Sequence, residues 1–182
     1  MHIDDLEYFM DIARTFNNVP KNGNGLELCR FEELPPGVEA RHVTDGQFQY
    51  VIINSSFNKS NYQLSELGYI MGIFVHEYRH VWQENYDPTG YFLDQINNTD
   101  FNNYHNKWIE HEFEQDAEAI KYLFYSEVLQ NDVQKNPKFM TYEDKVKSKV
   151  EELMTKNKNF VNIKGALEKM KASKEAFSKY IK

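Results

Sequence analysis

The chain has 182 residues, of which 41% are hydrophobic and 15% aromatic, and this composition excludes wholesale disorder. The single cysteine, Cys29, excludes an internal disulfide and a cysteine-based zinc ribbon. No apolar run approaches the roughly 18 residues of a transmembrane helix, and the first residues do not read as a secretory signal. We therefore expect a cytoplasmic protein without a membrane partner.

The net charge of −7 is unevenly distributed along the chain. Residues 1–132 contain 8 Lys or Arg and 22 Asp or Glu, whereas residues 133–182 contain 13 Lys and 6 Asp or Glu. The lysines are spread out, and neither an arginine nor a Gly-rich loop accompanies them, which argues against a nucleic-acid partner. We expect a domain over residues 1–132 and a Lys-rich helical extension over residues 133–182 that packs on it.

The first elements form a helix and a small sheet. Apolar residues at helical spacing predict a helix over residues 3–16. Residues 26–31 and 38–44 read as short strands, and residues 47–54, rich in β-branched and aromatic side chains, are the clearest strand. Because Asp45 and Gly46 form a hairpin-type turn, we expect a mostly antiparallel sheet.

The rest of the chain reads as helical. Helical spacing of apolar residues predicts helices over residues 63–85 and 107–131, separated by the loop-like residues 86–106. Two Lys-rich helices follow over residues 141–156 and 163–181. This order of helix, small sheet and long helices indicates the α+β class.

The motif His76-Glu77-Tyr78-Arg79-His80 lies inside the helix predicted for residues 63–85. Positions 76 and 80 are one helical turn apart on one face, so both imidazoles can reach one metal ion. Glu77 points to the side of that ion, where a carboxylate can take a proton from bound water. The spacing thus predicts a zinc site with Glu77 as the general base.

A catalytic zinc needs a third protein ligand. The metzincin pattern would require Gly and His at the positions of Gln83 and Tyr86, so that class is excluded. On a helical wheel of residues 107–131, Glu112 and Asp116 fall within the apolar face, whereas Glu114 falls on the face toward water. A carboxylate inside an apolar face is costly unless it is paired or binds a cation, so Glu112 is the expected ligand. The alternative is a partly buried ion pair of Glu112 with Arg79 or a lysine.

Two further residues are expected to support the ligands. Asp116, one turn after Glu112, is suited to accept the free N–H of His76 or His80. Gln83 lies close to the two histidines on its helix and is either an orienting residue for a ligand or substrate, or an ordinary polar helix residue.

The HExxH motif and the segment Glu112-x-x-Gln115-Asp116-x-x-Ala119 together resemble the gluzincin pattern, HExxH followed by E-x-x-A-[DN]-x-x-A. Their size and order are similar to the ImmA/IrrE-type and other minimal zincins of phages and mobile elements. The resemblance covers about residues 40–131. It implies a zincin-like α+β fold, Glu112 as the third zinc ligand, and an edge strand at residues 48–53 before the active-site helix.

The expected function is that of a zinc metallopeptidase with one zinc ion per chain, bound by His76, His80 and Glu112. Glu77 would act as general base and then protonate the leaving amine, and the strand at residues 48–53 would hold a protein or peptide substrate. The alternative is a non-catalytic zincin-fold interaction protein, such as a phage or mobile-element inhibitor, that binds a protein partner. For a phage-encoded chain the compartment would be the host cytoplasm.

Overall fold

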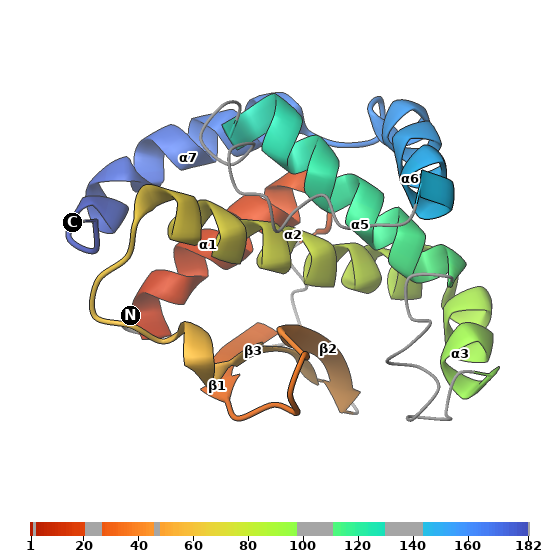
Figure 1. Ribbon diagram of the computed structural model, residues 1–182, viewed down its shortest axis with the longest axis horizontal. Helices are drawn as coiled ribbons and strands as arrows, with labels where there is room; N and C mark the ends of the chain where they lie inside the picture. The colour runs from red at the N-terminus through yellow and green to blue at the C-terminus, as the bar shows by residue number, and fades with distance from the viewer. Residues whose placement is uncertain (2, 21–26, 46–47, 98–110, 130–143, 182) are drawn as a thin grey trace.

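The computed structural model describes residues 1, 3–20, 27–45, 48–97, 111–129 and 144–181. A small sheet lies on one side of a layer of helices (Figure 1). The strands are β1 (Glu27–Glu32), β2 (Ala40–Asp45) and β3 (Phe48–Asn54). The helices are α1 (Ile3–Phe16), α2 (Leu64–Tyr86), α3 (Pro88–Asn97), α5 (Glu112–Phe124), α6 (Asp144–Asn157) and α7 (Ile163–Ser178). The predicted α+β class is confirmed.

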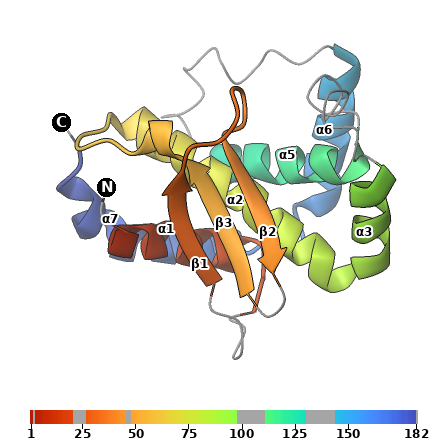
Figure 2. The same cartoon turned by 90° about the horizontal axis from the view of Figure 1, so that it is seen from below.

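The sheet has the order β1-β3-β2, with β3 between the other two strands (Figure 2). β2 and β3 pair in antiparallel fashion, as the turn at Asp45 predicts, but β1 pairs parallel to β3. The prediction of a mostly antiparallel sheet is therefore wrong, and the sheet is mixed. The reason is the connection over residues 33–39, which crosses β3 and brings the chain back as β2 on the far side of β3.

α2 crosses behind the sheet and forms the centre of the core (Figure 2). α1 packs on α2 because its apolar residues recur at helical spacing, and the ring centroids of Phe9 and Phe74 lie 5.5 Å apart. α7 packs on α1 as well, and the ring centroids of Phe177 and Phe9 lie 4.7 Å apart. α6 packs on α5 through Val150 and Ala119. The helices of residues 133–182 thus contact the rest of the chain through apolar side chains.

The structure differs from the prediction in where two of the helices begin. Residues 86–106 were expected to be loop-like, but α3 begins at Pro88. Proline suits the first position of a helix, and the Asp87 carboxylate caps α3 by accepting the N–H of Gly90 at 3.0 Å. α5 begins at Glu112 instead of near residue 107, and residues 98–110 lie outside the described part of the chain.

Within the described residues, no helix combines the length and the apolar character needed to cross a membrane.

Candidate metal centre

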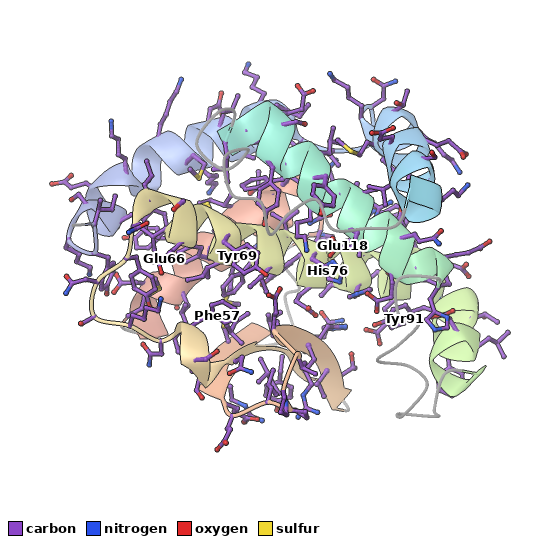
Figure 3. The ribbon with its side chains drawn as sticks, viewed as in Figure 1. Phe57, Glu66, Tyr69, His76, Tyr91 and Glu118 are labelled. Carbon is purple, nitrogen blue, oxygen red and sulfur yellow. The ribbon has the colours of Figure 1, made fainter. Side chains whose placement is uncertain are left out.

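His76 and His80 lie one turn apart on α2, as the spacing predicts, and both are buried. Their Nε2 atoms are 3.1 Å apart, and their ring centroids are separated by 4.8 Å. The site lies where α5 passes over α2 (Figure 3). Two imidazole nitrogens at this separation can bind one metal ion together.

Glu114 is the third group of this cluster. Its Oε2 atom lies 3.2 Å from Nε2 of His76 and 3.5 Å from Nε2 of His80. The three side chains are buried and can hold a metal ion between them, and we call them the candidate metal centre. Glu112, which the sequence predicts as the third ligand, is instead exposed at the start of α5.

The helical wheel does not identify the ligand because α5 is buried around most of its circumference. Its apolar face, represented by Ile120 and Phe124, lies in the main core, and Ala119 packs on Val150 of α6. The face toward α2 carries the buried Glu114, Glu118 and Lys121, a stripe that looks polar and therefore solvent-exposed in the sequence. The prediction that Glu112 is buried and Glu114 faces water is wrong because charges on α2 compensate the buried carboxylates.

Glu118 orients His76. Figure 3 shows the side chains of Glu118 and His76 next to each other. The Oε1 atom of Glu118 lies 2.9 Å from Nδ1 of His76 and 2.5 Å from Nζ of Lys121. Burial alone would raise the pKa of Glu118, but Lys121 and His76 outweigh it and lower this pKa to about 2. A carboxylate on the far nitrogen of a ligating histidine fixes the ring and increases its basicity.

Gln83 orients His80. Its Nε2 donates to the Phe113 carbonyl and to the Asp116 carboxylate, both at 2.9 Å, so its Oε1 must face Nδ1 of His80, at 2.8 Å. Because an amide oxygen only accepts, the hydrogen of His80 is assigned to Nδ1. Gln83 therefore fills the orienting role that the sequence left open.

Asp116 does not accept from either histidine, contrary to the prediction. Among the described residues it accepts from Nε of Arg79 at 2.6 Å, from Asn157 at 2.7 Å and from Gln83. Arg79 is itself buried, and its guanidinium lies 3.8 Å from the ring centroid of Trp82. Asp116 thus acts on His80 only through Gln83.

These contacts leave an electrostatic conflict that a cation resolves. With a hydrogen on Nδ1 of each ring, both Nε2 atoms carry lone pairs, and they face each other and a carboxylate. Three acceptors at this distance repel unless a proton or a metal ion lies between them. In the metal-free protein, burial opposes the charged imidazole, but Glu114 and Glu118 outweigh it and raise the pKa of His76 to about 10. The same negative surroundings favour a bound cation.

Glu77 lies beside the cluster and is buried. Burial raises the pKa of Glu77 above its usual value, although the two histidines oppose this. The backbone N–H of His42, in β2, donates to the Glu77 carboxylate. β2 is an edge strand, so this edge of the sheet lies beside the candidate metal centre.

Tyr91, on α3, is a residue of the site that no sequence motif includes. Its ring centroid lies 5.9 Å from that of His80 and 5.7 Å from that of Phe113. Burial, together with the charges of Glu77 and Glu114, raises the pKa of Tyr91, so it keeps its hydroxyl proton. No sequence signal identifies it because residues 86–106 were expected to be loop-like.

The second motif can also be counted from Glu114, two residues after Glu112. The third residue after Glu114 is Ala117, which matches the first alanine of the pattern, and the fourth is the acid Glu118. The third residue after Glu112 is Gln115, which does not match that alanine. Lys121 then stands at the last alanine position of the pattern when the count starts from Glu114, whereas the count from Glu112 places Asp116 and Ala119 correctly. The motif alone therefore does not single out Glu114, and only the docking of α5 on α2 identifies it.

Compared with protein-family models, curated proteins and solved structures, the chain shows no significant match. The arguments for its function therefore rest on the candidate metal centre itself.

Proposed function

We propose that the chain is a zinc-dependent metallopeptidase. The observation that carries the proposal is the convergence of His76, His80 and Glu114 with the buried Glu77 beside them. Two histidines and a glutamate with a neighbouring acid are the donor set of a gluzincin-type catalytic zinc site.

The separations of the donor atoms support zinc as the metal. Tetrahedral coordination at zinc–ligand distances of about 2.0–2.1 Å places ligand atoms about 3.3 Å apart. The three separations here are 3.1, 3.2 and 3.5 Å. Three protein ligands leave a fourth position for water or substrate, which distinguishes a catalytic site from a closed structural one.

Zinc held by these residues would supply Lewis acidity and an acidified water molecule. Glu77 would accept the proton of the attacking water as its oxygen adds to the peptide carbonyl. The same carboxyl would deliver this proton to the amine nitrogen as the C–N bond breaks. The burial that raises the pKa of Glu77 suits a group that must both take and return a proton. Tyr91 could donate a hydrogen bond to the developing oxyanion.

β2 would hold the substrate in extended form. The sequence assigns this role to residues 48–53, but β3 pairs with a strand on each side and has no free edge. β2 pairs only with β3 within the described sheet, and the His42 N–H on it points to Glu77. A peptide added along β2 would therefore lie beside the candidate metal centre.

The test compares metal content and hydrolysis in the same preparations. Purified wild-type protein should contain about one zinc ion per chain by elemental analysis, and a degenerate peptide library should show zinc-dependent cleavage by mass spectrometry. Glu77→Gln should retain the zinc and the fold but lose about a thousandfold or more in cleavage rate, because general base catalysis alone contributes roughly 10²–10⁴-fold.

Each result has a defined meaning. Wild-type protein without zinc, prepared without chelator, would contradict the metal site. A zinc-loaded protein whose cellular effect survives Glu77→Gln intact would instead favour the non-catalytic interaction protein.

A further inference from the structure

A cavity of about 400 Å³ opens beside the candidate metal centre. Its walls come from β2, the last turn of α2 and α3, and we call it the side pocket. The residues that line it are His42, Thr44, Glu84, Pro88, Tyr91 and Phe92. This volume lies within the range of about 300–1,000 Å³ that is typical of ligand sites.

Two wall residues connect the side pocket to the chemistry of the site. His42 donates its backbone N–H to Glu77, and Tyr91 packs next to His80. A peptide held along β2 would therefore have a side chain near the scissile bond directed into the side pocket.

The polar wall of the side pocket presents an unbalanced negative charge. Glu84 accepts a hydrogen bond of 2.8 Å from the Thr44 hydroxyl, and Nε2 of His42 lies 3.7 Å from its carboxylate. Burial and the nearby His80 lower the pKa of His42 to about 3, so its imidazole is neutral. No Lys or Arg side chain among the described residues forms an ion pair with Glu84.

His42 adds a second observation that points to a ligand. Its side chain is only 2% exposed, yet its Nε2 atom has no hydrogen-bond partner in the described part of the chain. A buried nitrogen at a pocket wall is usually satisfied, and a polar hydrogen from a bound group would satisfy it.

The remaining wall is aromatic. Tyr91 is partly buried and Phe92 is 63% exposed, and Pro88 completes this side. Aromatic faces next to a carboxylate suit a long basic side chain, whose methylene groups pack on the rings while its cation meets the acid.

We propose that the side pocket binds a Lys or Arg side chain of the peptide substrate next to the scissile bond. This inference rests on the proposed function, because it takes the ligand to be a peptide lying along β2. An acidic side chain would be repelled by Glu84, and an apolar one would leave the charge of Glu84 uncompensated and Nε2 of His42 without a hydrogen-bond donor. The net negative charge of residues 1–132 also favours a basic substrate, in agreement with the preference expected of the side pocket.

The test uses the full-length protein and two tripeptides, acetyl-Ala-Arg-Ala-amide and the same peptide with citrulline, which keeps the shape of arginine but is uncharged. Isothermal titration calorimetry should give about tenfold tighter binding of the arginine peptide, since a charge-assisted hydrogen bond in a partly exposed site is worth about this much. In Glu84→Gln, which keeps an acceptor for Thr44, the preference should fall to within about twofold. Glu168→Gln, which removes the same charge from an exposed position on α7, should retain it.

Equal binding of the two peptides by wild-type protein, no measurable binding of either, or a preference that survives Glu84→Gln would overturn the inference. Mass spectrometry of the titrated samples separates this inference from the proposed function. Cleavage without a preference for arginine contradicts only the side pocket, whereas a preference without cleavage of any library peptide contradicts only the hydrolase.

Discussion

Glu112 and Glu114 are two positions apart, which is about 200° around a helix, and this angle decides which of them can reach the histidines. The pair His76 and His80 could be predicted because both ligands belong to one helix, whose geometry alone places them together. The third ligand belongs to α5, so its identity depends on which face of α5 docks on α2. That face is stabilised by ion pairs between helices, such as Glu118 with His76, and an apolar pattern cannot reveal them.

This assignment can be tested with two matched substitutions. Glu114→Gln should weaken zinc binding by more than the roughly 10–100-fold that loss of an outer hydrogen-bond partner costs, because it removes a charged ligand. Glu112→Gln, at an exposed position two residues away, should leave the affinity unchanged within about twofold. Competition with a chromophoric chelator measures both affinities. The reverse result would restore Glu112 as the ligand.

At the scale of elements, α1, α2 and the three strands could be predicted to within about two residues because each carries a clear local pattern. The parallel pairing of β1 with β3 could not be predicted from a local pattern, because it depends on how residues 33–39 cross the sheet. α3 was missed because Pro88 reads as a helix stop when α2 ends just before it, whereas it begins a new helix. The side pocket depends on α3, so it too was inaccessible from the sequence.

The close approach of α2 to the π-helical turn at Tyr125–Leu129 gives a prediction at this scale. A Cβ atom at Gly72 would overlap the side chain of the buried Tyr125. Gly72→Ala should therefore destabilise the protein by about 1–3 kcal/mol, although alanine normally stabilises a helix by about 1 kcal/mol relative to glycine. Urea denaturation measures the change. In a Tyr125→Ala background the same substitution should be neutral or stabilising, and equal destabilisation in both backgrounds would show that these two residues do not conflict.

At the scale of the whole molecule, the opposite charges of the two parts of the chain predict docking of the Lys-rich extension. The structure contains such contacts, for example Lys169 with Asp11 at 2.6 Å. Both side chains are well exposed, and exposed ion pairs contribute only about 0–1 kcal/mol. The apolar contacts contribute more, because Phe177 of α7 is buried against Phe9 of α1. The extension is thus expected to depend more on packing than on charge.

The last prediction concerns whether residues 133–182 unfold together with the rest of the chain. Phe177→Ala should destabilise the whole protein by about 3–5 kcal/mol, because it leaves a cavity in a core shared by α1, α2 and α7. Lys169→Ala, which removes only an exposed ion pair, should cost less than about 1 kcal/mol. Urea denaturation should be followed by far-ultraviolet circular dichroism and by tryptophan fluorescence, to which Trp82 of α2 contributes. The two signals should shift together in Phe177→Ala, since one core unfolds in one transition. A fluorescence midpoint that stays at the wild-type value while the dichroism signal separates into two steps would show that the extension is an independent unit.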